Sequence, residues 1–294
     1  MKSGGQSAIL FCMDVSSVRA RARPPIVDGL FYPAEKGPLT AMVEDLLARS
    51  STAEGAAFAV VSPHAGYGYA GGVIASAFRA LRLRPVRTAV LIGPVHRDPV
   101  EGLFLPESRV FRTPLGEVPV DRTAIEALLA SGPLFTMNDI PHLEEHCLEV
   151  QLPFLVHLFP HAEILPVLMG SQGAAAVSAL SEALRLTFAD SRDYIAVVAT
   201  ANMASYMTGR DVESENRALE ELITGRDWRG ILSARDSGKI SSCGTGAIAA
   251  ALSLAGENCR VELLNRASSR GKDEEPDRAV HYAAVGVWDG ALAH

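Results

Sequence analysis

The fold is decided by one stretch of sequence, Phe58-Ala59-Val60-Val61-Ser62-Pro63-His64-Ala65-Gly66-Tyr67. Its first four residues are apolar, which predicts a buried strand of a parallel sheet, because such a strand is covered on both faces. The proline and glycine that follow predict a tight turn that directs His64 outward from the end of the strand. The chain repeats this design at Thr88–Ile92, which is followed by glycine, proline and then His96. Since open α/β sheets bind ligands at the carboxyl ends of their strands, both histidines are candidate site residues.

The rest of the chain alternates between helix and strand patterns. Apolar residues at helical spacing predict helices over residues 38–49, 71–83, 144–158, 174–188, 212–223 and 246–254, and Pro153 is expected to kink the third of these. Apolar runs predict further strands at residues 164–169, 194–199, 261–264 and 282–288, and residues 110–118 predict an edge hairpin. This alternation predicts an α/β fold with a central mixed, largely parallel sheet flanked by helices. We expect a single domain over residues 23–294, preceded by a flexible leader at residues 1–22.

Composition excludes several classes of partner. The 294 residues are 48% hydrophobic, which allows a large core. There are 27 Lys and Arg against 34 Asp and Glu, and this net charge of −7 argues against binding to a nucleic acid. The basic stretch Arg19–Arg23 is isolated and is expected to be a solvated part of the leader. No apolar run reaches the ~20 residues of a membrane span, and the four cysteines lack tight spacing, so we expect a cytoplasmic protein with reduced thiols and no membrane partner.

A third candidate site residue is Cys243, which precedes Gly244-Thr245-Gly246 and an alanine-rich helix. A thiol at a helix N-terminus meets partial positive charge, which lowers its pKa and makes the thiolate available to a metal or as a nucleophile. Imidazole nitrogen and thiolate sulfur are donors that suit zinc, copper or iron better than magnesium or calcium. The sequence therefore predicts a metal site formed by His64, His96 and Cys243.

Other residues are expected to surround these three. His146 lies in the segment Glu144–Pro153, from which it could be directed into the site as a supporting donor. The segment Thr200–Tyr206 follows a third predicted strand and should line the same crevice with Asn202, Ser205 and the Tyr206 phenol. Tyr67 is also assigned to the crevice. Cys147 and Cys259 are predicted to be inert thiols of the core.

Five motifs, in this order, resemble those of the Memo family, whose prokaryotic members form the AmmeMemoRadiSam system protein B group. They are Arg23-Pro24-Pro25 with Asp28–Pro33, Pro63–Tyr67, Leu91–His96, Glu145–Phe154 and Cys243–Gly246. The resemblance implies a fold like that of the class III extradiol dioxygenases. It also implies that His64, His96 and Cys243 occupy the metal-ligand positions, with iron or copper as the metal in a redox role. A radical SAM protein or a peptide is the partner that it implies.

The chain departs from the family pattern at Thr245, where the family commonly has an arginine, and more importantly in one loop. The family usually has Ser-Ser-Asp-Met-Ser-His-Tyr where this sequence has Thr200-Ala201-Asn202-Met203-Ala204-Ser205-Tyr206. An aspartate is thus replaced by Asn202 and a histidine by Ser205. In the related dioxygenases a histidine of the equivalent loop is the acid/base, and a serine hydroxyl cannot take that part near neutral pH. We therefore do not expect dioxygenase activity.

Three other interpretations stay open at the level of sequence. A metal-dependent oxygenase or hydrolase would need His146 as its base. A metal-free binding module would hold a peptide or a small molecule in the crevice. A thiol hydrolase would use Cys243 as its nucleophile, with His64 or His96 as the base.

Overall fold

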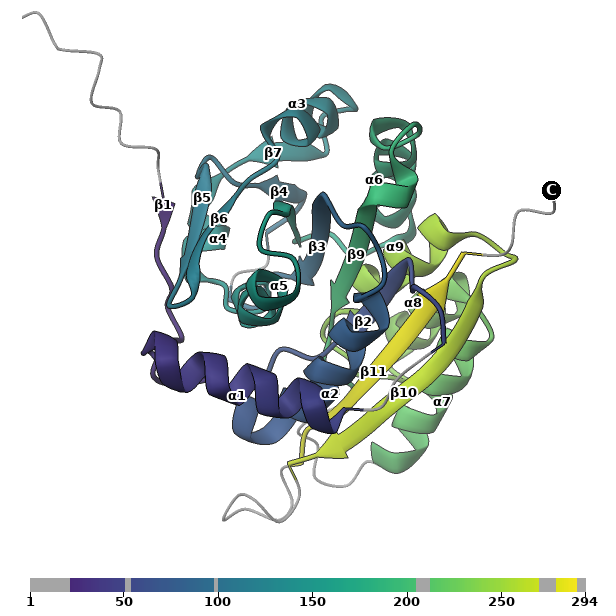
Figure 1. The fold of residues 1–294 in the computed structure, drawn as a ribbon. Helices are drawn as coiled ribbons and strands as arrows, with labels where there is room; N and C mark the ends of the chain where they lie inside the picture. Colours follow the sequence, from purple (N-terminus) through teal and green to yellow (C-terminus); the bar gives the residue numbers. More distant parts are fainter. Residues whose placement is uncertain (1–21, 51–53, 98–99, 205–211, 270–278, 290–294) are drawn as a thin grey trace, which may run out of the picture.

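A computed structural model of the chain describes residues 22–50, 54–97, 100–204, 212–269 and 279–289 (Figure 1). Its main sheet has eight strands in the order β10-β11-β2-β9-β3-β8-β4-β7. Their bounds are β2 Ala59–Ser62, β3 Thr88–Pro94, β4 Leu103–Leu105, β7 Phe135–Met137, β8 Glu163–Met169, β9 Ile195–Thr200, β10 Arg260–Ser268 and β11 His281–Trp288. The four central strands β2, β9, β3 and β8 run parallel, whereas β11 pairs antiparallel with β2 and β4 pairs antiparallel with β8. The expected mixed sheet is confirmed.

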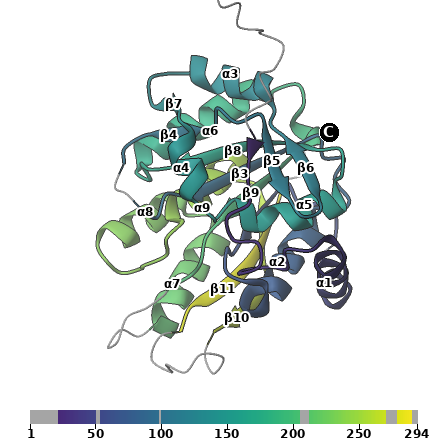
Figure 2. The same ribbon diagram turned by 90° about the vertical axis from the view of Figure 1, so that its left-hand side faces the viewer.

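Helices cover both faces of this sheet. On one face lie α1 (Lys36–Arg49), α2 (Tyr67–Leu81) and α5 (Leu152–Leu158), and on the other lie α6 (Ala174–Thr187), α7 (Val212–Thr224), α8 (Trp228–Asp236) and α9 (Thr245–Ala255). Figure 2 shows α7, α8 and α9 on the left, α1, α2 and α5 on the right, and strands between them. Two short helices, α3 (Arg122–Ala130) and α4 (Asp139–Glu144), lie beside β7 and β4. The central strands are therefore buried on both faces, as their apolar sequences predict.

The hairpin predicted at residues 110–118 forms, but it is not at the edge of the main sheet. Its strands β5 (Val110–Thr113) and β6 (Gly116–Pro119) join β1 (Ala22–Arg23) in a separate sheet of three strands. β1 pairs parallel with β5. The chain thus brings Arg23 back against the middle of the sequence, which matters for the site described below.

The single helix predicted over residues 144–158 is wrong. The chain forms α4, then a 3-10 turn at Glu149–Gln151, and then α5, which contains Pro153 in its first turn. Proline is tolerated there because its missing N–H would have no partner within the helix. Pro153 therefore helps to begin a helix instead of kinking one, and His146 lies between the two helices.

The ends of three central strands position the site. β2, β9 and β3 are neighbours, and the last residues of β2 and β9, Ser62 and Thr200, are partners in the sheet. Parallel strands finish at the same edge, so the residues that follow them must meet there.

Among the described residues, none of the helices has the length and apolar character needed to cross a membrane.

Candidate functional site

Three side chains reach the site from equivalent positions after neighbouring strands. His64 lies two residues after the end of β2, Asn202 two residues after β9, and His96 two residues after β3. Cys243 approaches from the other side, just before α9. The residue between it and that helix, Gly244, is required by packing, because a Cβ atom there would lie 2.5 Å from the Thr200 carbonyl oxygen. This close approach places Cys243 beside the strand ends.

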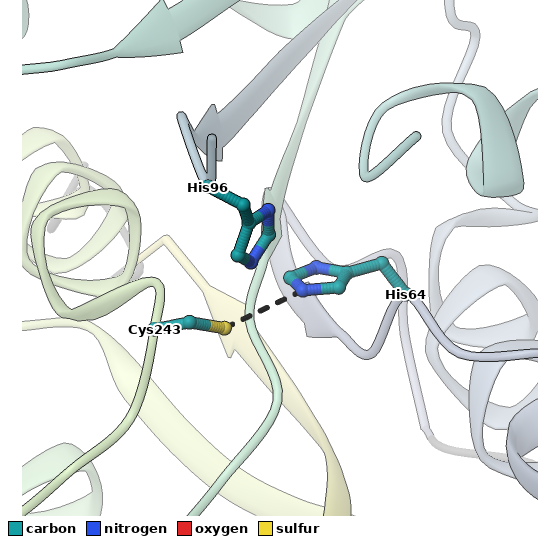
Figure 3. Close-up of side chains that lie close together, drawn as sticks. All are labelled: His64, His96 and Cys243. Carbon is teal, nitrogen blue, oxygen red and sulfur yellow. Dashed lines mark hydrogen bonds between the residues drawn. The ribbon is translucent and has the colours of Figure 1, made fainter. Parts of the chain in front are cut away.

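His64, His96 and Cys243 come together as the sequence predicts (Figure 3). Cys243 Sγ lies 3.4 Å from His64 Nε2, and the two imidazole rings are 5.0 Å apart between centroids and nearly perpendicular. One donor atom from each of the three residues lies within 4.8 Å of the others. His64 is buried, Cys243 is half-buried and His96 is exposed, so the cluster is open to ligands on the side of His96.

A chain of buried polar side chains holds His64. Its Nδ1 lies 2.8 Å from Thr200 Oγ1, which also accepts a hydrogen bond from Gln151 Nε2 at 3.1 Å. Gln151 Oε1 in turn accepts from the Ser62 hydroxyl at 2.8 Å. The backbone N–H of His64 donates to Asn202 Oδ1 at 3.1 Å. Thr200 belongs to the segment that was expected to line the crevice, although it was not singled out there, whereas Gln151 was missed because only its hydrogen bond to Thr200 identifies it.

Glu145 is a further residue that sequence reasoning did not single out. Its Oε1 lies 3.0 Å from His96 Nδ1 and 3.1 Å from His146 Nδ1, and its side chain is 4% exposed. Burial opposes ionisation of this carboxyl, but the hydrogen bonds from His146 and His96 outweigh it and hold the pKa of Glu145 well below its usual range. The site therefore contains a buried carboxylate behind two imidazoles.

The electrostatics of the cluster favour a thiolate. Burial opposes ionisation of Cys243, but the nearby His64 and His96 rings stabilise the anion and lower the pKa of Cys243 to about 5. Burial likewise opposes protonation of His96, but hydrogen bonds to Cys243 and Glu145 raise its pKa to about 10. The metal-free cluster at neutral pH thus pairs a thiolate with an imidazolium, and a metal that binds here must displace the proton.

The three residues of the cluster line a pocket of about 590 Å³. His146 and Asn202 line this pocket, together with an apolar and aromatic wall formed by Leu30, Phe31, Tyr69, Val280 and Tyr282. Tyr67, which was expected in the crevice, instead belongs to the core. It is 4% exposed and its hydroxyl donates to the Val150 carbonyl at 2.8 Å. Ser205 and Tyr206 lie outside the described residues.

Arg23 and Glu149 form a buried ion pair next to the backbone of Glu145. Arg23 Nη1 lies 2.6 Å from Glu149 Oε2, and the side chains are 1% and 0% exposed. The expectation that the Arg19–Arg23 stretch is solvated is therefore wrong for Arg23. Glu149 also accepts hydrogen bonds from the backbone N–H groups of Ile26 and Val27 and from the Tyr32 hydroxyl. This ion pair joins the N-terminal segment to the loop that carries Glu145 and His146.

The other two described thiols are placed as the sequence predicts. Cys147 and Cys259 are buried, and burial raises the pKa of each. Cys147 packs against the backbone of Gly93, where a Cβ atom would lie 2.5 Å from its Sγ. Neither thiol lines the pocket that contains Cys243.

Comparison with known proteins finds similarity over nearly the whole chain. A family model described as "Memo-like protein" matches residues 23–286. A MEMO1 family protein of Thermoplasma volcanium is 28% identical over 265 residues, which cover 90% of this chain and 97% of the relative. One from Thermotoga neapolitana is 31% identical over 251 residues, covering 81% and 90%, and one from Methanosarcina barkeri is 30% identical over 266 residues, covering 90% and 98%.

Proposed function

The chain belongs to the Memo-like protein family, and on that premise we propose that it binds a redox-active transition metal, iron or copper, through His64, His96 and Cys243. The observation that carries the proposal is the mutual approach of the three donor atoms within 4.8 Å. A tetrahedral ion with bonds of about 2.0 Å to nitrogen and 2.3 Å to sulfur separates those two donors by about 3.5 Å. The distance between Cys243 Sγ and His64 Nε2 is 3.4 Å, which fits such an ion.

The chemistry of the donor set also supports the proposal. Two imidazoles and a thiolate are borderline and soft ligands, which bind iron, copper or zinc in preference to magnesium or calcium. When bound, iron or copper would supply one-electron redox chemistry. The protein would act through that redox step or through a partner, for which a radical SAM protein or a peptide is our proposal. Zinc fits the same donors and would make the site a Lewis acid instead.

Metal analysis of anaerobically purified protein tests this proposal. We expect the wild-type protein to retain iron or copper in stoichiometric amount and the Cys243→Ala variant to lose it. Removal of a group that only supports a ligand costs about 10- to 100-fold in affinity, so loss of the ligand itself should cost at least as much. Cys259→Ala is the matched control, because Cys259 is a buried thiol outside the pocket. Equal metal content in all three proteins would refute the assignment.

A second candidate function is a metal-dependent oxygenase or hydrolase. It is favoured by one observation, namely that His146 lines the same pocket as the three proposed ligands and could serve as the base. A pocket of about 590 Å³ with an apolar wall would accommodate a small organic substrate. A metal-free binding module would use the same pocket. The metal analysis distinguishes the metal-dependent functions from this metal-free one.

We expect no ring cleavage of catechols by the protein supplied with Fe(II), because Ser205 stands where the related dioxygenases have a histidine acid/base and Asn202 stands where the family has an aspartate. The double variant Asn202→Asp with Ser205→His returns a carboxylate and an imidazole to this loop, and we expect it to bind metal more tightly or with a changed pH dependence. Oxygen uptake and product absorbance measure the first effect, and metal titration measures the second. Catechol turnover by the unmodified protein would show that another base, such as His146, replaces the missing one.

A further inference from the structure

We propose that Glu145 is a positioning residue that holds the rings of His96 and His146 so that the Nε2 atom of each faces the pocket. The two rings are stacked, with centroids 5.4 Å apart and planes 25° apart. Both Nδ1 atoms lie within 3.1 Å of one carboxylate oxygen of Glu145. A single buried side chain therefore sets the orientation of two imidazoles.

The hydrogen bonds at Glu145 determine which ring nitrogen faces the pocket. An ionised carboxylate only accepts hydrogen bonds, so Nδ1 of each histidine must carry the proton that it shares with Glu145. The partner of one ring nitrogen decides the role of the other, and a carboxylate partner also makes that other nitrogen more basic. His96 Nε2 is then directed at the cluster, where an ion would displace its proton, and His146 Nε2 is directed at a molecule that enters the pocket.

Glu145 is itself held too firmly to act as a ligand. Its Oε2 accepts from the backbone N–H of His96 at 2.9 Å, and its Oε1 accepts from the backbone N–H groups of His146 and Cys147 at 2.9 and 3.2 Å. Its carbonyl oxygen accepts from Arg23 Nη2 at 2.7 Å. A metal ion between Glu145 and the two histidines would have to break the hydrogen bonds to the backbone. The short distances within this group are therefore explained by hydrogen bonding instead of by a second metal site.

The two proposed histidine ligands therefore differ in the group that each Nδ1 atom contacts. His64 Nδ1 meets the neutral hydroxyl of Thr200, whereas His96 Nδ1 meets the carboxylate of Glu145. The carboxylate should make His96 the more strongly bound of the two ligands.

Glu145 follows α4 directly, and its neighbour Glu144 is exposed, so the chain provides a matched position for comparison.

Histidine ring ¹⁵N NMR of the metal-free wild-type protein tests the positions of the protons. We expect Nδ1 of both His96 and His146 to be protonated. In the Glu145→Gln variant these two Nδ1 signals should move, because an NH₂ group replaces one of the two acceptor oxygens. Whichever way the amide is turned, this NH₂ group faces an N–H donor that contacts oxygen in the wild-type protein. The Glu144→Gln control should leave them unchanged. An unprotonated Nδ1 in either histidine of the wild type would overturn the proposal without use of any variant.

Metal titration gives a second readout. Unlike the NMR experiment, it rests on the proposed function, because it requires that the protein binds a metal. We expect Glu145→Gln to lower metal affinity about 10- to 100-fold and Glu144→Gln to leave it unchanged. If the wild-type protein binds no metal, the proposed function fails while the NMR experiment still decides the role of Glu145. If Glu145→Gln shifts neither the ring signals nor the affinity, Glu145 does not position the histidines.

Discussion

At pH 6, Cys243 of the metal-free protein will react with a limiting alkylating reagent at least about 10-fold faster than a thiol with an unshifted pKa. A thiol with a pKa of 9.0 is about 0.1% thiolate at pH 6, whereas Cys243, with a pKa of about 5, is about 90% thiolate. A thiolate of low pKa is also a weaker nucleophile, which over this pKa difference cancels roughly 40- to 100-fold of the gain. The larger thiolate fraction of Cys243 therefore outweighs the lower nucleophilicity of its thiolate.

The pH profile of the labelling rate is the sharper measurement. Because the pKa of Cys243 is lowered, its thiolate persists as pH falls and is lost only near pH 5. The rate should therefore be nearly constant from pH 6 to 8, whereas an ordinary thiol becomes about tenfold more reactive with each pH unit in this range. Bound metal should protect Cys243. A Cys12→Ser background removes the thiol that lies outside the described residues, and mass spectrometry identifies the labelled cysteine. Labelling of Cys147 or Cys259 to the same extent would contradict the placement of Cys243.

Replacement of Glu149 by alanine is expected to lower the free energy of unfolding by about 3–5 kcal/mol. Glu149 is the buried partner of Arg23, and its removal would leave a guanidinium that is 1% exposed without its carboxylate. The N–H groups of Ile26 and Val27 and the Tyr32 hydroxyl would lose an acceptor as well. Domains of this kind have total stabilities of about 5–15 kcal/mol, so the expected loss is a large fraction of the total.

Urea unfolding followed by circular dichroism measures this loss. The control is Glu182→Ala, which removes an exposed ion pair with Arg185 whose atoms are 3.1 Å apart. Such pairs contribute little, so the control should change stability by less than about 0.5 kcal/mol. A loss below about 1 kcal/mol in Glu149→Ala would show that Arg23 can reach solvent when its partner is removed. The segment that carries Arg23 would then not be tied to the site as described.

Local patterns in the sequence were sufficient for most of the fold. The apolar runs of β2 and β3 and the helical spacing of α6 and α7 predict those elements to within a few residues. Burial on both faces leaves a continuous apolar run, and burial on one face of a helix leaves a helical period. The prediction failed over residues 144–158, where the chain leaves the helical pattern for a turn. Apolar residues at helical spacing cannot distinguish one helix from two helices joined by a short turn. Here the Glu145 carboxylate accepts hydrogen bonds from the backbone N–H groups of His146 and Cys147, which favours the turn.

The apolar runs predict where the strands end, and parallel strands of one sheet finish at the same edge, so the sequence predicts that His64 and His96 lie at one edge. The placement of β9 between their two strands, and the contacts that hold the histidines, depend on the tertiary packing. Glu145 is 49 residues away from His96 in sequence, and Glu149 is 126 residues away from Arg23. Buried polar contacts of this kind have no period and no preferred spacing, since each depends on which side chains the packing of the core brings together. The protonation of the cluster, and with it the reactivity of Cys243, follows from those contacts.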